Sequence, residues 1–265
     1  MLQIFLFVTS ALQPPTHDMK NFLIATALLA APLSQAAMIA HYDFSDGNLL
    51  DNEVSASYNL TQGGSGFGTG ITLNGDGSAH IDGGGNNNTN FLKASGIGAG
   101  TGSDFTISMW FKTDTTNPTT HSSFASGGSG TWQVEHYVSA LRVNTDTPIT
   151  TSTSLSADTW YQAVVWTDGT DSKLFMSEEG GALTEVGSAS NNALTLNDLS
   201  IGINRGGNLT WQGDYANIQV YDEALDNATI TTILDAGSGV ASVPEPSAVS
   251  LLGLGGLALI LRRKK

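Results

Sequence analysis

Residues 159–166, TWYQAVVW, restrict the fold of this chain more than any other stretch. As an extended strand they place apolar side chains on both faces, so both faces must be covered. We expect such a strand near the centre of a sheet, with a further layer on each side. The turn residues DGTDS follow and lead into residues 173–177, KLFMS, which predicts a β-hairpin.

A second strand, predicted over residues 105–112 (FTISMWFK), has one purely apolar face. Alternate side chains of a strand share a face, so this pattern predicts one row in the core and one row opposite. The core row contains Phe105, Ile107, Met109 and Phe111, and the opposite row contains Thr106, Ser108, Trp110 and Lys112.

The last predicted strand alternates in the same way. Ala216, Ile218 and Val220 are expected on one side, and Tyr215, Asn217, Gln219 and Tyr221 on the other.

A short helix is expected after this strand. Asp226 is suited to its N-cap and Gly237 to its end. Long helical periodicity is absent before residue 223, while glycine, serine, threonine and asparagine are abundant. The sequence therefore predicts an all-β domain with a short C-terminal helix.

The last 23 residues, 243–265, combine three features in a fixed order. Pro244, Glu245 and Pro246 form an extended tripeptide, an uncharged apolar run covers residues 248–261, and Arg262 and Arg263 begin a cluster of four cations. As a helix the apolar run would reach about 21 Å, against a hydrocarbon core of about 30 Å. We expect a segment that meets a membrane but spans it only marginally.

The other end of the chain carries a secretory leader. From Met19 the sequence has one cation, an apolar region over residues 22–33 and small residues suited to cleavage after Ala36. Residues 1–18 fit no leader pattern well, and we interpret Met19 as the true start; an unusually long leader is the alternative. The predicted organisation is a leader over residues 1–36, one domain over 37–241 and a C-terminal segment over 242–265.

The predicted domain is acidic and has no cysteine. Of the 24 acidic residues only Asp18 and Glu245 lie outside it, and only five of the ten Lys and Arg residues lie inside, so its net charge is −17. Nucleic acid is therefore not an expected partner. Calcium or a neutral polymer is compatible with this charge.

Taken in order, the segments resemble the laminin G-like, concanavalin A-like lectin/glucanase family. The matching pieces are residues 41–53, 70–82, 105–114, 159–177, 199–206 and 211–230. The resemblance implies a jelly-roll sandwich of two antiparallel sheets, which can leave one concave face open to a ligand. The chain departs from the family at the last strand, where Ala216 and Asn217 occupy the places of a frequent acidic pair.

The C-terminal segment is similar to PEP-CTERM sorting signals of Gram-negative bacteria. This resemblance implies a membrane-embedded exosortase and the secretion machinery as partners, with cleavage near Pro244–Pro246. It also implies a transient inner-membrane anchor, followed by delivery to the cell surface or extracellular matrix.

Enzyme activity requires a site that the sequence does not offer. Retaining glycosidases use two carboxyl groups about 5–5.5 Å apart, which a strand supplies from acids at i and i+2 or i+4. No predicted strand has such a pair: Glu178 and Glu179 are neighbours, and so are Glu135 and His136. No catalytic residue is predicted, although a secreted glycan hydrolase of this fold stays an alternative.

Two binding sites are nevertheless expected. Acidic loops, with Asp43 and Asp46 as the candidate ligands, suggest one structural calcium ion. Aromatic and amide side chains on one face of a strand suit sugar binding, which favours a platform of Tyr215, Asn217, Gln219 and Tyr221, extended by Trp211 and Trp110.

The leading hypothesis is a non-catalytic exported protein of the cell surface or matrix. It would bind carbohydrate or associate with extracellular polysaccharide, and a purely structural or adhesive module is the second alternative.

Overall fold

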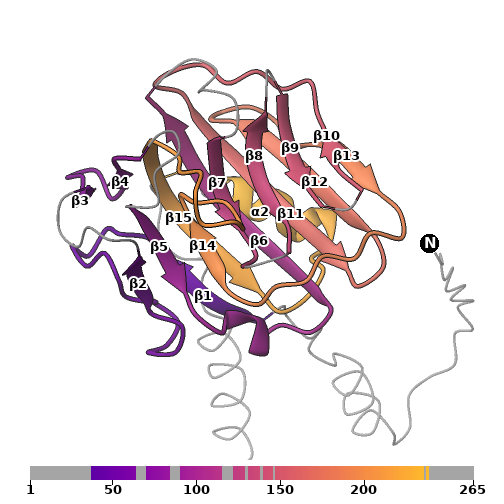
Figure 1. Cartoon of the computed structure of the whole chain (residues 1–265), viewed down its shortest axis with the longest axis horizontal. Coiled ribbons are helices and arrows are strands. Elements are labelled where there is room, and N and C mark those ends of the chain that lie inside the picture. The colour runs from indigo at the N-terminus through magenta and orange to yellow at the C-terminus, as the bar shows by residue number, and fades with distance from the viewer. Residues whose placement is uncertain are drawn as a thin grey trace, which may run out of the picture. The chain divides into compact units, whose positions relative to one another are not determined.

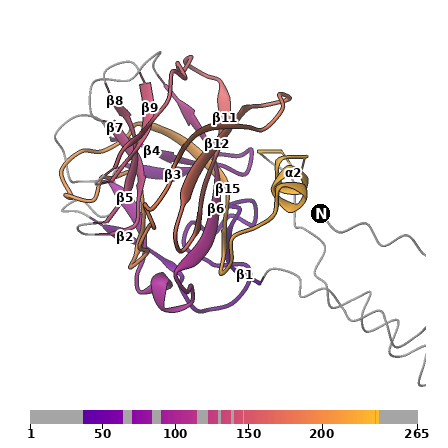
Figure 2. The ribbon, with the colours of Figure 1, turned by 90° about the vertical axis from the view of Figure 1, so that its right-hand side faces the viewer.

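The computed structural model describes residues 37–63, 70–83, 90–114, 122–128, 131–137, 140–145, 147–235 and 237–238. Two antiparallel sheets pack face to face, and the helix α2 lies against the outer face of one of them (Figures 1 and 2). The predicted all-β sandwich with two antiparallel sheets and a short C-terminal helix is confirmed.

The sheet nearer to α2, called sheet A here, contains the three longest of the described strands at its centre. Its order is β13 (Thr184–Ala189), β12 (Ser172–Glu178), β11 (Trp160–Asp168), β6 (Asp104–Thr113), β15 (Gly213–Tyr221), β4 (Ala79–Ile81) and β3 (Ile71–Leu73), while β1 (Met38–Tyr42) also pairs with β15.

The second sheet, sheet B, faces the viewer in Figure 1. Its order is β10 (Ile149–Thr150), β9 (Ala140–Asn144), β8 (Gln133–Tyr137), β7 (Ser122–Ser126), β14 (Leu199–Ile201), β5 (Phe91–Ala94) and β2 (Leu60–Gly63). A short 3-10 helix, η1 (Ile97–Ala99), follows β5.

The core between the sheets is built from alternate residues of their strands. Phe105, Ile107, Met109 and Phe111 of β6 all belong to it, as predicted. Phe111 stacks on Phe124 of β7 with ring centroids 4.4 Å apart, so one aromatic pair joins the two sheets.

Strand β11 is covered on both faces, as its sequence requires. Ala163 and Val165 pack into the core between the sheets, while Val164 packs with Ile230 and Ile233 of α2 on the outer face. Strand β11 also pairs with β12 on one side, in the predicted hairpin, and with β6 on the other.

The helix α2 (Asn227–Asp235) begins at the expected cap. The Asp226 carboxylate accepts a hydrogen bond from the Thr229 N–H at 2.8 Å, and Gly237 follows the helix with a φ of 73°. An Asp side chain satisfies an N–H group that has no partner inside the helix, which fixes where the helix starts.

The predicted faces of β15 are wrong at one end of the strand. The register with β6 changes between Ala216 and Gln219, where β15 carries one extra residue, and Asn217 has a φ of 45°. This β-bulge reverses the alternation, so Tyr215 points into the core with Ile218 and Val220, whereas Ala216 packs against Trp110 outside it. Tyr215 therefore does not share a face with Gln219 and Tyr221.

No helix within the described part of the chain is both long and apolar enough for a membrane span. The predicted cleavage site at Ala36, the apolar run 248–261 and the Pro244–Pro246 tripeptide lie outside the described residues.

Candidate functional site

The side chains predicted to form a sugar-binding platform on β15 are buried. Tyr215 and Trp211 are fully inaccessible, and Asn217, Gln219 and Tyr221 expose at most 4% of their surface. Trp110 is equally buried. The Tyr215 hydroxyl donates to the Phe124 carbonyl at 3.2 Å inside the core. The prediction of an accessible sugar-binding platform on β15 is therefore wrong. The bulge turns Tyr215 into the core, and the other predicted side chains are also buried.

The polar side chains of β15 instead form a closed network with β1. Asn217 Oδ1 accepts a hydrogen bond from Gln219 Nε2 at 2.8 Å and lies 3.0 Å from His41 Nε2, and the Tyr221 hydroxyl donates to Gln219 Oε1. Burial lowers the pKa of His41 more than its contacts raise it, so the imidazole is neutral at pH 7. Asn217 Nδ2 donates to the Gly237 carbonyl, which ties the end of the described chain to β15.

A second polar cluster joins three strands at one end of sheet A. Asp214 of β15 lies 2.8 Å from Lys112 Nζ and 2.8 Å from His80 Nδ1. Burial raises the pKa of Asp214, but its bonds to Lys112 and His80 outweigh this effect and hold the pKa below its usual range. These groups are mutually satisfied, which indicates a structural role.

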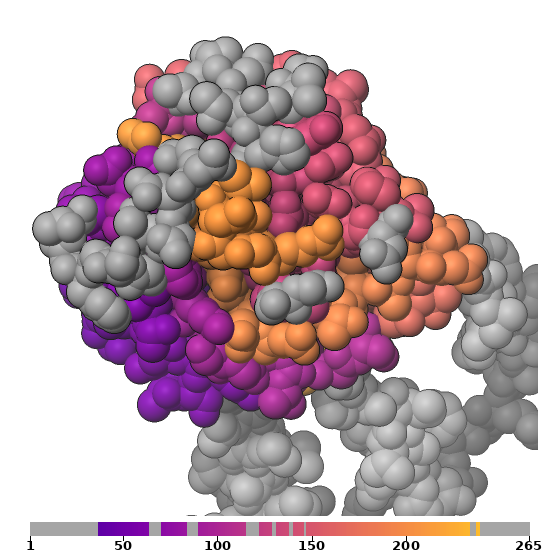
Figure 3. All heavy atoms as spheres, in the orientation of Figure 1, coloured from indigo at the N-terminus to yellow at the C-terminus, as the bar shows by residue number. Residues whose placement is uncertain are grey.

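An open pocket of about 300 Å³ lies on the outer face of sheet B, away from β15. Small-ligand sites typically begin near this volume. Its lining comes from β5, β7 and β14, from the loops that follow β7 and β14, and from the residue before β14: Phe91, Lys93, Ser126, Gly128, Asp198, Ser200, Ile203, Asn204, Arg205, Gly206 and Gly207. Figure 3 looks onto this face, where orange segments lie across the middle of the sheet.

One wall of the pocket is an aromatic ring fixed by a neighbouring glycine. A Cβ atom placed on Gly63 of β2 would lie 1.9 Å from the Phe91 ring. The ring therefore lies over the backbone of Gly63, which only glycine permits. Phe91 offers an apolar face of the kind that packs against the CH groups of a sugar.

An ion pair forms another part of the lining. Lys93 Nζ lies 2.8 Å from Asp198 Oδ2, and the Gly96 N–H donates to the same carboxylate at 2.6 Å. The bond from Lys93 and then the bond from Gly96 lower the pKa of Asp198, so this carboxylate stays ionised and balances the charge of Lys93.

The loop after β14 is held in shape by Asn204. Its Oδ1 atom accepts hydrogen bonds from the N–H groups of Asn208 and Leu209, and Gly207 supplies the positive φ of 71° that the turn needs. The Arg205 N–H donates to Gln133 Oε1 at 3.2 Å, which fastens the loop to β8. The loop is therefore a fixed wall of the pocket.

Ser126 contributes a buried hydroxyl to the pocket lining. Its side chain is 1% exposed and lines the pocket, yet its Oγ atom has no hydrogen-bond partner among the described residues. A buried hydroxyl without a partner destabilises a protein by about 1–3 kcal/mol. A polar ligand atom in the pocket would satisfy it.

A fully buried carboxylate lies beside the pocket on the same face. Glu135 of β8 accepts hydrogen bonds from Gln133 Nε2 at 2.5 Å, Arg142 Nε at 2.6 Å and Asn144 Nδ2 at 3.0 Å. Among the described strand residues of sheet B it is the only acid. The two-carboxylate arrangement of a glycosidase is thus not built from these strands.

The sequence reasoning did not identify any of these pocket residues as a site. The polar Ser200 between the apolar Leu199 and Ile201 was a usable signal for an outward-facing position. Nothing local in the sequence shows that Phe91, Ser126 and Arg205 come together, because three separate elements supply them.

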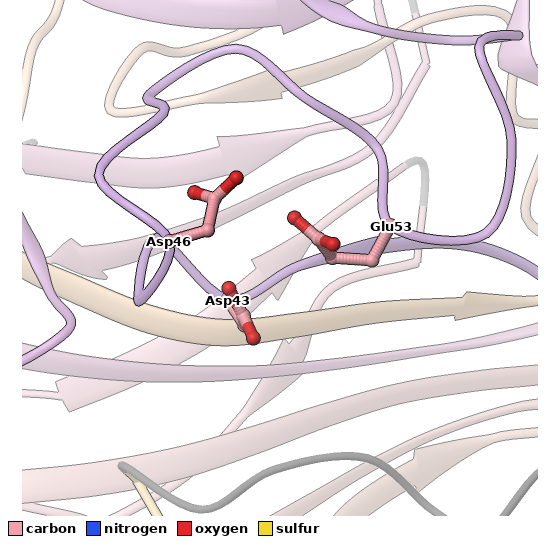
Figure 4. A group of neighbouring side chains, drawn as sticks. All are labelled: Asp43, Asp46 and Glu53. Atoms are coloured by element: carbon pink, nitrogen blue, oxygen red, sulfur yellow. The ribbon is translucent and has the colours of Figure 1, made fainter.

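The predicted calcium ligands do converge. Carboxylate oxygens of Asp43, Asp46 and Glu53 lie within 4.8 Å of one another. Figure 4 shows the three side chains gathered beside one loop. Burial and then the charges of Asp43, Asp46 and Asp51 raise the pKa of Glu53. However, Asp43 also accepts bonds from Ser45 and Asp46 from Asn48, as expected of ordinary loop carboxylates, so calcium stays a prediction.

If these acids hold calcium, adding it after chelation should raise the melting temperature and release or absorb heat. The pKa of Glu53 is raised, so its proton competes with the cation, and affinity should fall as the pH drops toward that pKa. Calorimetry of the parent and the Glu53→Gln variant measures both effects. Absence of binding heat together with an unchanged melting temperature in the parent would remove the calcium site.

Comparison with protein families gives two matches. Residues 83–231 match the model of the concanavalin A-like lectin/glucanases superfamily, and residues 242–265 match the PEP-CTERM protein-sorting motif. The sorting motif indicates an exported, exosortase-sorted surface protein. No curated protein matches the sequence.

Solved structures share the fold at low sequence identity. Domain 4 of AbnA, a GH43 extracellular arabinanase from Geobacillus stearothermophilus solved with arabinotriose, has a TM-score of 0.59 and 17% identity, with 76% of this chain and 100% of that chain covered. The binding domain of Botulinum neurotoxin DC in complex with SialylT has a TM-score of 0.52 and 10% identity, with 75% and 51% covered.

The binding domain of Paraclostridial Mosquitocidal Protein 1 is similar to a comparable degree. It has a TM-score of 0.54 and 15% identity, with 75% of this chain and 52% of that chain covered. The chain thus spans about half the length of these toxin domains and the whole of the arabinanase domain. At these identities the likeness extends to the fold alone.

Proposed function

The chain belongs to the concanavalin A-like lectin/glucanases superfamily, and on that premise we propose that it is an exported, non-catalytic protein that binds carbohydrate in the pocket on sheet B. The observation that carries this proposal is the buried Ser126 hydroxyl, which has no partner in the described part of the chain and lies in a pocket walled by the Phe91 ring. A hydroxyl for hydrogen bonding and a flat apolar ring are the two kinds of contact that sugars require.

The sorting motif supports a site of action outside the cell. Under this proposal an exosortase of a Gram-negative bacterium captures the C-terminal segment at the inner membrane, and the domain then associates with extracellular polysaccharide. Solved structures of similar fold include one domain in complex with arabinotriose and one in complex with SialylT, which agrees with a binding role.

A glycan array with the full domain tests the proposal. The parent should bind a defined set of glycans. Phe91→Ala should weaken binding by at least about fivefold, since loss of a central aromatic contact costs more than about 1 kcal/mol. Ser200→Tyr should prevent binding by filling the pocket.

The matched control is Tyr221→Phe, which removes a hydroxyl from the strand first expected to bind sugar but leaves the pocket intact. It should bind as the parent does. If the parent binds no glycan, the structural-module alternative is favoured, and release of reducing sugar by the parent would instead indicate a hydrolase.

A further inference from the structure

Two of the three cations at or beside the pocket have acidic partners among the described residues. Lys93 is paired with Asp198 at 2.8 Å, and Arg142 is paired with Glu135 at 2.6 Å. Arg205 also lines the pocket but has no acidic partner within 4.0 Å among the described residues. Among the described residues, Arg205 is thus the one cation of the pocket lining without an acidic partner.

The guanidinium of Arg205 is positioned without being neutralised. Its Nη1 atom donates to the main-chain carbonyls of Thr131 at 2.5 Å and Asn144 at 3.4 Å, which carry no net charge. An arginine has five N–H donors in a rigid planar fork. Two carbonyl contacts on one nitrogen hold the group in place and leave further donors for a ligand.

The surrounding face is unusual for so acidic a domain. The described strands of sheet B contain Lys93 and Arg142 but Glu135 as their only acid. In contrast, the strands of sheet A carry Asp104, Asp168, Glu178, Glu185 and Asp214 against two lysines. The strands of sheet B therefore repel an anionic ligand less than the strands of sheet A do, and the one acid of the pocket lining, Asp198, is paired with Lys93.

Arg205 lines the same pocket as Ser126, whose buried hydroxyl has no hydrogen-bond partner among the described residues. An anionic group and a hydroxyl on one small ligand would satisfy both. Phe91 adds an apolar surface to the same pocket. A sugar that carries a carboxylate combines all three features.

We propose that the pocket selects an acidic sugar, a uronate unit of a polysaccharide, whose carboxylate pairs with Arg205 while one of its hydroxyl groups bonds to Ser126. The proposal rests on the carbohydrate-binding function and adds the ligand class. A planar carboxylate matches the guanidinium fork with two parallel, charge-assisted hydrogen bonds, which are stronger than bonds from the same fork to neutral hydroxyls.

Calorimetric titration with paired ligands tests this selection. The probes are trisaccharides of galacturonate, mannuronate and glucuronate, each compared with its methyl ester, which keeps the hydroxyls but loses the charge. The parent should bind at least one acid about tenfold or more tightly than its ester, and this preference should shrink as salt is added.

Arg205→Gln should remove the preference for the acid while the ester still binds. Arg205→Lys should keep part of it, since a lysine retains the charge but not the fork. The matched control Ser126→Ala should weaken acid and ester alike and keep the preference. The salt dependence of the parent tests the charge contribution even if Arg205→Gln fails to fold.

The outcomes separate the two proposals. Equal affinity of the parent for every acid and its ester, or binding only of sulfated or neutral array glycans, would overturn the uronate assignment and leave carbohydrate binding standing. Failure of the parent to bind any glycan at all would overturn both.

Discussion

Replacing Glu135 with alanine should lower the free energy of unfolding by about 3–5 kcal/mol, the range for removing one partner of a buried ion pair. The carboxylate is fully buried and accepts bonds from Gln133, Arg142 and Asn144. Without this carboxylate, Arg142 loses its acidic partner. The Arg142 side chain is only 17% exposed, so water screens its charge poorly. Urea unfolding of parent and variant at pH 7 measures the difference.

The chain offers a matched control in an exposed ion pair. Glu185 lies 3.4 Å from Lys173, with side chains 40% and 34% exposed. Glu185→Ala should change stability by less than about 1 kcal/mol, because solvent screens such pairs. If the free energy of unfolding of both glutamate variants lies within about 1 kcal/mol of the parent value, the Glu135 network does not stabilise sheet B.

The Glu135 network also bears on the pocket. Gln133 donates to Glu135 through Nε2 and accepts the Arg205 N–H through Oε1. Loss of Glu135 frees Gln133 and so loosens the loop that carries Arg205. We therefore expect the Glu135→Ala protein, where it remains folded, to bind its glycan more weakly than the parent.

Phe111→Ala should destabilise the domain by a similar amount, about 3–5 kcal/mol. Phe111 is fully buried, stacks on Phe124 of the opposite sheet and meets Trp211 edge to face at 5.8 Å. Alanine would leave a cavity between the sheets that these rings cannot fill. Thermal and urea unfolding report the loss.

A second apolar residue provides the comparison for Phe111. Val54 is 40% exposed, and its change to alanine should alter stability by no more than about 0.5 kcal/mol. Equal effects of the two substitutions would contradict the assignment of Phe111 to the core between the sheets.

The sequence predicted the parts of the fold that local patterns determine. The alternation of residues 105–112 and the two apolar faces of residues 159–166 arise from the period of a strand, and β6 and β11 confirm both. The cap at Asp226 depends on side-chain chemistry a few residues long, and it was also predicted correctly.

The bulge in β15 is where alternation failed. A positive φ at Asn217 inserts one residue, so Tyr215 turned out to face the core. Asparagine tolerates this conformation better than most residues, and Ala216 and Asn217 already marked a departure from the family pattern. These two residues are a sign of the bulge in the sequence, but the alternation pattern alone does not predict it.

The pocket could not be predicted because its parts are distant in sequence. Phe91, Ser126 and Arg205 belong to β5, β7 and the loop after β14, and only the pairing of β14 with both neighbouring strands brings them together. The predicted sugar site takes its aromatic and amide residues from one strand, whereas the candidate pocket takes single residues from several strands and loops.

The position of a bound glycan tests the central claim most directly. A crystal structure of the domain with an oligosaccharide selected by the array should show the sugar over the Phe91 ring, with ligand oxygens within hydrogen-bonding distance of Ser126 Oγ and the Arg205 guanidinium. A glycan bound on the outer face of sheet A, or anywhere that leaves the sheet B pocket empty, would contradict the account.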